Sequence, residues 1–518
     1  MSKKKNNSRN NRVVQDNPAK SMYGVQKNGG KNKHKQSNFS RVFGLTLAGI
    51  QLVMTIIFML SLFVLNMLPM KYLVAIGLVF VIIWLLIFLS QFLSKKKGIT
   101  GKIISVLMSI VLVFGSFYIF KTNGTVQEIS GGGKKIDRMV VAVLKEDQAE
   151  TIEDAVNYTF GVQYSMRGED VKSTVSAINE ELGMDITTNE YGNLREQAKA
   201  LHENEVQAII YNEAYMGVLE DEFSDFENSV KIIYSHDIET KVENKAEKVE
   251  VKNDTFTVYI SGIDVYGAIE TNSRSDVNIM AVVNPTSHQI LLVTTPRDYY
   301  VEIPGISGGE KDKLTHAGIY GVDASMATLS ALYGIDMDFY ARVNFTSLIT
   351  MIDALGGVDV YSDQAFDTVA GTTVNAGMNH FNGEQALAFS RERYNVAGGD
   401  FQRGKNQQAV ITAMIKKAVS PAILMGANGI LESISGNVDT NMSSEQIQTL
   451  IKSQLSTSAS WSIKSMAAEG TGDQQYCYSS PGMLLYVTQP DMVSIEEIRN
   501  AIEAVKDGAV FQDSEVAE

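Results

Sequence analysis

The chain has 518 residues, of which 45% are hydrophobic and 20% charged, so it is long enough to form more than one folded domain. Its formal net charge of -14 is unevenly distributed, because residues 1–120 hold 16 Lys and Arg against one acid and the remainder holds 29 against 58. Such an acidic remainder would repel nucleic acid, which excludes DNA binding by that part, and the single cysteine, Cys477, excludes an intrachain disulfide.

The chain begins with a basic tail and three apolar stretches. Residues 1–41 are rich in Lys, Asn, Gly and Ser and lack the apolar content of a core, so we expect a disordered tail. Residues 42–120 contain the uncharged stretches Phe43–Leu65, Tyr72–Leu93 and Ile103–Phe120. Each is close to the roughly 20 residues that cross a bilayer, which predicts three transmembrane helices.

Basic residues flank these stretches asymmetrically. The tail and the second loop are rich in Lys and Arg, whereas the first loop has only Lys71. By the positive-inside rule, we expect the N-terminus in the cytoplasm and the C-terminal domains outside the cell membrane. An exported domain without disulfides fits a bacterial surface.

Residues 121–253 predict a small extracellular accessory α/β domain with its linkers. Strand-like segments, Met139–Leu144, Gln207–Tyr211 and Val230–Tyr234, alternate with helical ones. No group of residues with recognisable chemistry occurs in this region, so we expect an accessory or partner-binding role.

Residues 254–420 predict the catalytic domain, and residues 421–518 a C-terminal extension of it. Five arginines recur near acids in this part of the chain: Arg274, Arg297, Arg391, Arg393 and Arg403. Guanidinium groups present planar sets of donors that suit phosphate oxygens, so several at one place indicate a polyanionic ligand, for which we expect a pyrophosphate.

Residues 276–283 and 288–295 flank a strong turn signal and predict a β-hairpin. If residue 283 faces residue 288, then Arg274 faces Arg297 at the open end. Unit charges about 5 Å apart repel by roughly 3 kcal/mol at an effective dielectric near 20, unless an anion lies between them. The alternative is that each arginine lies at the surface and pairs with Asp276 or Asp298.

Four further groups can converge from two later segments. A short predicted helix, Asn382–Phe389, leads into Arg391 and Arg393, which share a face where the chain is extended. On the next helix, Arg403 and Gln407 are four residues apart and also share a face.

Two acids are candidate ligands of a divalent cation, Mg²⁺ or Mn²⁺. Asp264 ends the apolar strand that starts at Phe256, and Asp276 follows Arg274. Magnesium commonly binds one or two carboxylates together with phosphate oxygens and water. The alternative is that Asp264 forms a turn and Asp276 only orients Arg274. His316 has no serine or cysteine nucleophile at a suitable spacing, so we expect it to be structural.

Two segments, Val322–Tyr333 and Phe345–Leu355, place apolar residues at helical spacing. Such helices usually form core. A tunnel between them is the alternative, and it could hold an isoprenoid tail.

Several motifs between Thr255 and Ala418 follow the order of a known family. They are Arg274-Ser275-Asp276, Thr294-Thr295-Pro296-Arg297-Asp298, Lys313-Leu314-Thr315-His316-Ala317, Asp353-Ala354-Leu355-Gly356-Gly357-Val358-Asp359, Phe381-Asn382-Gly383-Glu384-Gln385-Ala386-Leu387, Arg391-Glu392-Arg393, and Asp400-Phe401-Gln402-Arg403 with Gln407. In these motifs the chain resembles the LytR-CpsA-Psr family of cell-envelope phosphotransferases, in particular its capsule-associated members in Gram-positive bacteria.

The resemblance implies an α/β/α sandwich that binds polyprenyl pyrophosphate, with the lipid tail between the sheet and its helices. It implies catalytic roles for Arg274 and Asp276 and magnesium-linked roles for Asp264 and Asp276. The head-group contacts that it implies are Arg274, Arg297, Arg391, Arg393, Arg403 and Gln407.

The function expected from this resemblance is magnesium-dependent transfer of a glycopolymer, such as a capsular polysaccharide, from undecaprenyl pyrophosphate to peptidoglycan. The reaction would take place at the outer face of the membrane, with membrane lipid as a further partner. Alternatives are a pyrophosphatase and a non-catalytic lipid-binding scaffold that recruits capsule assembly proteins. A transcription regulator would require DNA binding by residues 1–41.

Overall fold

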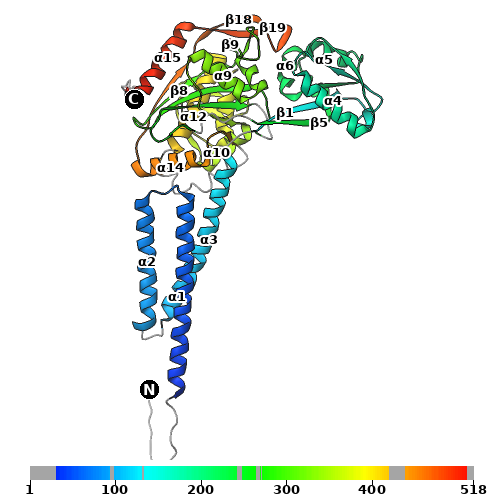
Figure 1. Cartoon of the computed structure of the whole chain (residues 1–518). Helices are drawn as coiled ribbons and strands as arrows, with labels where there is room; N and C mark the ends of the chain where they lie inside the picture. Colours follow the sequence, from blue (N-terminus) through cyan, green and yellow to red (C-terminus); the bar gives the residue numbers. More distant parts are fainter. Residues whose placement is uncertain are drawn as a thin grey trace, which may run out of the picture. The chain divides into compact units, whose positions relative to one another are not determined.

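In the computed structural model, residues 31–93, 98–130, 134–241, 248–263, 269, 271–418, 420 and 438–509 are described. The chain starts with three long helices and continues into two sheets with their covering helices (Figure 1). The long helices are α1 (Lys31–Leu65), α2 (Met70–Leu93) and α3 (Ile99–Ile129).

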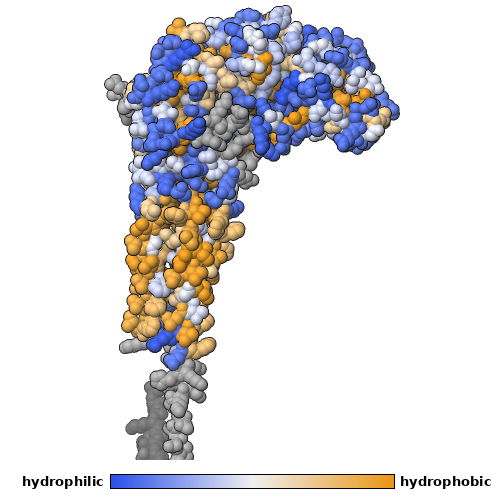
Figure 2. Space-filling model, viewed as in Figure 1, coloured by the Kyte–Doolittle hydropathy of each residue, from blue (hydrophilic) through white to orange (hydrophobic). Residues whose placement is uncertain are grey.

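These three helices are long and apolar enough to cross a membrane. The qualifying segments are Asn38–Leu65, Met70–Leu93 and Ile99–Gln127. Apolar side chains cover their surface, whereas the surface over the sheets is mainly polar (Figure 2). Helix α1 begins within the stretch predicted as a disordered tail, and residues 1–30 of that stretch lie outside the described part of the chain.

The accessory region forms a five-stranded sheet with helices on both faces. Its strand order is β3-β2-β4-β1-β5. The hydrophobic cores on the two faces contain α5 and α6 on one side and α4 on the other. The two short strands β2 and β3 had not been expected, and β3 consists of polar residues with little hydrophobic signal. The bounds are β1 (Lys134–Leu144), β2 (Thr159–Val162), α4 (Gly168–Leu182), β3 (Thr187–Glu190), α5 (Leu194–His202), β4 (Ala208–Asn212), α6 (Met216–Glu222), α7 (Phe226–Ser229) and β5 (Val230–Lys241).

A second sheet of six strands carries the arginines. Its order is β16-β11-β6-β7-β8-β17, in which β6, β8, β11 and β17 run in one direction and β7 and β16 in the other. The strands are β6 (Phe256–Ile263), β7 (Ser275–Asn284), β8 (Gln289–Thr294), β11 (Phe339–Val343), β16 (Val438–Thr440) and β17 (Ser462–Ala467).

Helices cover both faces of this sheet, which confirms the predicted α/β/α sandwich. Helices α9 and α15 bury one face, where Met280, Leu291 and Leu329 are fully buried. Helix α12 covers the other face and also packs with α10 and α11. The helices are α8 (Leu314–Ala317), α9 (Val322–Tyr333), α10 (Phe345–Ala354), α11 (Gly383–Arg391), α12 (Gly399–Ala418), α14 (Ser444–Thr457) and α15 (Met492–Lys506).

The residues after 437 complete this domain. They supply an edge strand on each side of the sheet and the helix α15, whose apolar side is buried against β7 and β8. The antiparallel pairs of strands are β9 (Tyr300–Glu302) with β10 (Lys311–Lys313), β12 (Val358–Ser362) with β15 (Gly377–Phe381), β13 (Phe366–Asp367) with β14 (Thr373–Val374), and β18 (Gly470–Cys477) with β19 (Ser480–Pro490).

Helices α9 and α10 occupy separate hydrophobic cores. Helix α9 packs with α15 on one face of the sheet, and α10 packs with α11 and α12. The two helices therefore do not enclose a tunnel between them. Each packs its apolar side into a hydrophobic core.

Glycine is required where α11 meets α10. A Cβ atom at Gly383 would lie 2.3 Å from the Ile349 carbonyl oxygen and 2.7 Å from its Cα atom. Because these are backbone atoms, we expect Gly383→Ala to destabilise the fold by about 1–3 kcal/mol. Thermal unfolding followed by circular dichroism measures the change. Gly404→Ala is the matched control, since its Cβ atom would meet Thr294 Cγ2 at an ordinary 3.6 Å, and equal midpoints for both variants would contradict the prediction.

Candidate active site

The candidate site lies at one edge of the six-stranded sheet. Strands β6, β8 and β11 end there, at Ile263, Thr294 and Val343, and β7 begins there at Ser275. In open α/β sheets, the crevice outside the carboxyl ends of parallel strands is the usual position for a ligand. Arg274 and Arg297 lie directly beyond the ends of β7 and β8.

The hairpin of β7 and β8 forms, but the predicted register is wrong by two residues. Val283 pairs with Ile290, and Asn284 pairs with Gln289. The Asn284 side chain accepts hydrogen bonds from the backbone N–H groups of residues 286 and 287, and His288 has a φ of 54°, so His288 belongs to the turn. Because of this shift, Arg297 is level with Asp276 and the predicted pair of like charges is replaced by a pair of opposite charges.

Asp276 is the centre of the site. Arg297 Nη1 donates to its Oδ1 atom at 2.8 Å, and the Thr315 hydroxyl donates to the same atom at 3.2 Å. The side chains of Asp276 and Arg297 are only 15% and 17% exposed. Burial opposes ionisation of Asp276, but the charges of Arg297, Arg274 and Arg403 together hold its pKa below the usual value. Three of the five predicted arginines thus act on one carboxylate.

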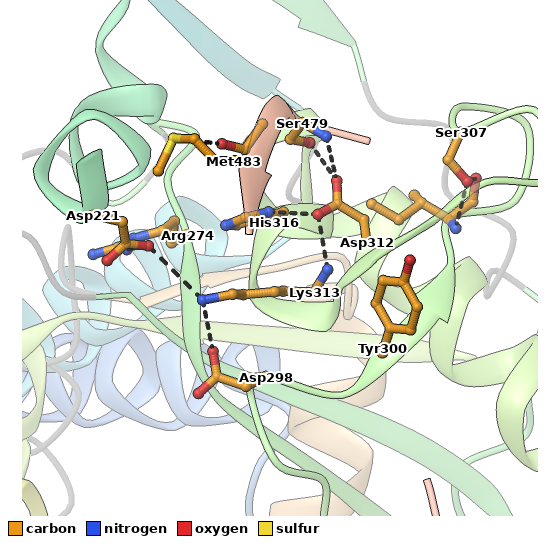
Figure 3. Close-up of polar contacts among 12 residues, drawn as sticks. Asp221, Arg274, Asp298, Tyr300, Ser307, Asp312, Lys313, His316, Ser479 and Met483 are labelled. Atoms are coloured by element: carbon orange, nitrogen blue, oxygen red, sulfur yellow. Dashed lines mark hydrogen bonds and ion pairs between the residues drawn. The ribbon is translucent and has the colours of Figure 1, made fainter. Parts of the chain in front are cut away.

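Arg274 and Lys313 belong to an adjoining group of charges (Figure 3). Arg274 Nη1 lies 3.8 Å from Asp221 Oδ2 and donates to the Gly217 carbonyl oxygen at 3.1 Å. Lys313 Nζ lies 3.8 Å from the same Asp221 oxygen and 3.4 Å from Asp298 Oδ1. Lys313 is only 8% exposed, and these two carboxylates offset the desolvation of its ammonium group.

Helix α12 brings Arg403 to the end of β8. The helix approaches closely at Gly404, next to Thr294, and Gln408 donates to the carbonyl oxygens of Leu292 and Met466 at 3.2 and 2.9 Å. Gln407 is partly buried on this helix, one turn after Arg403.

Arg391 and Arg393 are exposed and lie on either side of a buried acid. The Arg391 guanidinium stacks 4.2 Å above the Phe345 ring, and Arg393 contacts Tyr394. Arg391 ends α11 and the next residue is extended, so the predicted extended geometry begins only at Glu392.

Glu392 organises this segment and was not predicted. It is 4% exposed and accepts backbone hydrogen bonds from Val369 at 2.6 Å and from residues 393, 394 and 395 at 3.1, 2.8 and 3.0 Å. Burial opposes its ionisation, and these four N–H donors lower its pKa. Glu392 therefore fixes the backbone between Arg391 and Arg393.

A buried polar network lies beside Lys313 (Figure 3). Asp312 is 0% exposed, bonds His316 Nδ1 at 2.6 Å and accepts the backbone N–H of Ser479 at 2.9 Å. Burial raises the pKa of Asp312, whereas His316 and the hydrogen bonds lower it to a net value below the usual one. The network connects the tip of the β18–β19 hairpin to the segment that carries Lys313 and Thr315.

The predicted metal ligands are described only in part. Asp264 lies outside the described residues. Within the described ranges, no group of three or more His, Cys, Asp or Glu side chains is placed to hold a metal ion. Asp276 offers carboxylate oxygen, which suits Mg²⁺, but three arginines surround it, so phosphate oxygens would have to supply the remaining ligands and charge.

The site residues that the sequence does not predict differ in how much signal they carry. Lys313 and Thr315 lie within a motif that was recognised, but their contacts were not foreseen. Glu392 looked like one member of an exposed charged run. Gly217 and Asp221 carry no sequence signal, because they lie in α6, far from the arginines along the chain.

This cluster of partly buried cations at the carboxyl edge of an α/β/α sheet is chemically suited to a phosphate-bearing ligand. The model of the LytR_cpsA_psr family matches residues 222–498. The chain belongs to this family, as the motifs had indicated.

Several relatives are similar to this chain. A Bacillus anthracis protein, polyisoprenyl-teichoic acid–peptidoglycan teichoic acid transferase TagU, is 37% identical over 205 residues, which are 39% of this chain and 66% of that protein. The TagU of Enterococcus faecalis is 33% identical over 241 residues, 46% of this chain and 78% of that protein. The crystal structure of Bacillus subtilis TagV is 27% identical with a TM-score of 0.43, covering 49% of this chain and 98% of that one.

The Glu392 carboxylate provides a test of how the arginine segment is held. In Glu392→Gln, an amide nitrogen replaces one acceptor oxygen and faces backbone N–H donors. We expect a loss of about 1–3 kcal/mol in stability and weaker binding of inorganic pyrophosphate, used as a probe for a phosphate-bearing ligand, because Arg391 and Arg393 lose their fixed backbone. Thermal unfolding and calorimetric titration measure the two effects. The control Glu384→Gln makes the same change at an exposed position of α11, and equal behaviour of the two variants would refute the role of Glu392.

Proposed function

We propose that this protein transfers a glycopolymer from a polyprenyl pyrophosphate carrier to peptidoglycan. The observation that carries the proposal is the grouping of Arg274, Arg297 and Arg403 around the partly buried Asp276. Family membership and the names of the transferase relatives support the same reaction class. The carrier is undecaprenyl pyrophosphate, and the polymer is capsular polysaccharide or a related glycopolymer.

The charges of the site support binding of a diphosphate. Among the described residues, four cationic side chains, Arg274, Arg297, Arg403 and Lys313, lie with three acids, Asp276, Asp298 and Asp221. Guanidinium and ammonium groups are strong hydrogen-bond donors to phosphate oxygens. In phosphoryl transfer, positioning and stabilisation of charge on the phosphate oxygens supply most of the catalysis. An acceptor sugar hydroxyl attacks the phosphorus that carries the polymer and releases its proton to solvent. The bond from this phosphorus to the bridging oxygen breaks, and undecaprenyl phosphate leaves with that oxygen.

Residues beyond this group extend the proposed site. Arg391 and Arg393 contact the distal part of the head group from their exposed segment, and Gln407 lies one turn from Arg403. Apolar side chains between the sheet and α12 are only partly buried, among them Val277 of β7 and Ile411 and Ile415 of α12. We assign the lipid tail to this face, between the sheet and α12.

Magnesium is the proposed cofactor, with Asp276 and Asp264 as its protein ligands. When bound, it would supply additional positive charge for the phosphate oxygens. The arginines lower the pKa of Asp276 despite its burial, so the carboxylate stays ionised at neutral pH and can serve as a ligand without losing a proton. Arg297 and Thr315, which both bond Oδ1, fix its orientation.

The three apolar helices suit an enzyme whose carrier lipid is in the same membrane. We propose that the N-terminus is cytoplasmic and that both sheets lie outside, where the lipid carrier and the wall acceptor are accessible. Anchoring would confine the search for the carrier to two dimensions.

Removal of Arg297 tests the catalytic assignment. In Arg297→Ala we expect transfer to fall by about 10²–10³-fold, because one preorganised donor to the phosphate is lost. The full chain in detergent is incubated with lipid-linked polymer and peptidoglycan fragments, and the product bond is identified by mass spectrometry. Arg138→Ala, which removes an arginine paired with Asp237 in the accessory sheet, should retain transfer.

Three results of this assay would contradict the proposal. Unchanged transfer by Arg297→Ala removes the catalytic assignment. Release of free polymer phosphate despite added wall fragments indicates a pyrophosphatase. Retention of lipid without turnover by the unaltered protein indicates a scaffold.

Metal dependence is tested by chelation. We expect EDTA to abolish transfer and added Mg²⁺ or Mn²⁺ to restore it, and we expect Mg²⁺ to bind tightly only when pyrophosphate is present, because the arginines repel a cation in its absence. Calorimetric titration of Mg²⁺ with and without inorganic pyrophosphate measures this coupling. Asp276→Asn should weaken it, and transfer at the full rate in EDTA would refute the role of the metal.

A further inference from the structure

The accessory domain reaches into the candidate active site through helix α6. Arg274 Nη1 donates to the Gly217 carbonyl oxygen at 3.1 Å, and Asp221, one turn further along α6, lies 3.8 Å from the same nitrogen. Asp221 is also 3.8 Å from Lys313 Nζ, so a single accessory carboxylate lies between two cations of the catalytic domain (Figure 3). The family model begins at residue 222 and so starts after both α6 residues.

The guanidinium of Arg274 lies against the backbone of Gly217. A Cβ atom at this position would be 2.1 Å from Arg274 Cζ, 2.3 Å from Nη2 and 2.4 Å from Nε. These distances are far below van der Waals contact, so any side chain other than hydrogen would displace the guanidinium. The close approach and the hydrogen bond together fix both the position and the plane of the Arg274 head group.

The chain just before Arg274 is also attached to the accessory sheet. The backbone N–H of Asn272 donates to the Ile136 carbonyl oxygen at 2.9 Å, and its side chain donates to Asp137 at 2.9 Å. Asp137 is 1% exposed and forms a salt bridge with Arg167, which in turn donates to the Ile319 carbonyl oxygen at 3.3 Å. Both the backbone before Arg274 and its side-chain tip are therefore held by accessory residues.

We propose that the accessory domain is a working part of the active site, in which Gly217 is a positioning residue for Arg274. This proposal rests on the proposed function. The Gly217 carbonyl oxygen accepts a hydrogen bond from Nη1, and the other N–H groups of Arg274 donate to the pyrophosphate. Asp221 reduces the repulsion between Arg274 and Lys313 before the diphosphate arrives, and the diphosphate then takes over this role.

The variant Gly217→Ala separates this positioning role from a structural one. Alanine is the better helix former, and the atoms it would displace are the end of a flexible side chain, so we expect α6 to remain folded. Transfer should fall by about 10- to 100-fold, because a shift of about 1 Å in a catalytic group can cost about 100-fold. The loss should appear in kcat more than in KM. Gly168→Ala, at the first turn of α4 in the same domain, is the control and should retain transfer, since its nearest neighbour would be a Tyr164 carbon at 3.3 Å.

A double-mutant cycle provides the decisive readout. The full chain carries Gly217→Ala, Arg274→Ala or both, and transfer is measured with lipid-linked polymer and peptidoglycan fragments. If Gly217 acts through Arg274, the double variant is no slower than Arg274→Ala alone. Unchanged midpoints of thermal unfolding verify that each variant is folded.

The possible failures point to different conclusions. If Arg274→Ala transfers at the normal rate, the proposed function loses its catalytic arginine, and the positioning role is lost with it. If Arg274→Ala abolishes transfer but Gly217→Ala leaves it unchanged, only the accessory-domain proposal is overturned. Losses that multiply in the double variant overturn it as well, because they show that Gly217 acts independently of Arg274.

Discussion

The ion pair between Asp276 and Arg297 is the interaction on which the site depends. It links the start of β7 to the segment after β8, and it exists only because the hairpin pairs Asn284 with Gln289. With the hairpin shifted by two residues, Arg297 would face Arg274, and the edge of the sheet would carry two adjacent cations. With the observed register, Asp276 pairs with Arg297 and compensates part of the positive charge of the arginines.

The location of this pair explains why residues from distant parts of the chain meet. Four strands of the sheet run in the same direction, so the segments that leave them emerge at one edge. Helix α12 is held over this edge by Gln408, which bonds carbonyl groups of β8 and β17. Strand β17 comes from the C-terminal region, so this region contributes directly to where Arg403 lies. A truncation that removes β17 would take away one of the two carbonyl acceptors of Gln408.

The predictions that succeeded were those that rest on local periodicity. The apolar spacing over Val322–Tyr333 gave helix α9 with the same bounds, and long uncharged stretches gave the three apolar helices. The register of β7 and β8 failed because it is decided by one side chain: Asn284 caps the turn and moves His288 out of the strand. Hydrophobic alternation cannot detect a shift of two residues, since such a shift keeps every side chain on the same face.

Contacts between distant segments were inaccessible for a different reason. Arg274 meets α6 because two separate sheets are joined by hydrogen bonds at Ile136 and Asn272, and no local pattern encodes that joint. The burial of Glu392 could not be predicted from its sequence neighbours, because a glutamate between two arginines is typical of an exposed charged segment. Its burial follows from four backbone donors that converge only after the chain turns there.

The buried network around Asp312 supports the segment that carries Lys313 and Thr315. Lys313 and Thr315, which contact Asp298 and Asp276, follow Asp312 directly in the chain. Asp312 is fixed by His316 on one side and by Ser479 on the other, so the segment between them has little freedom. A buried carboxylate is stable only when such partners compensate its desolvation. His316, which the sequence predicts to be structural, thus holds the segment that carries Lys313 and Thr315. The β18–β19 hairpin bonds the same Asp312 through Ser479, so the C-terminal region also supports this segment.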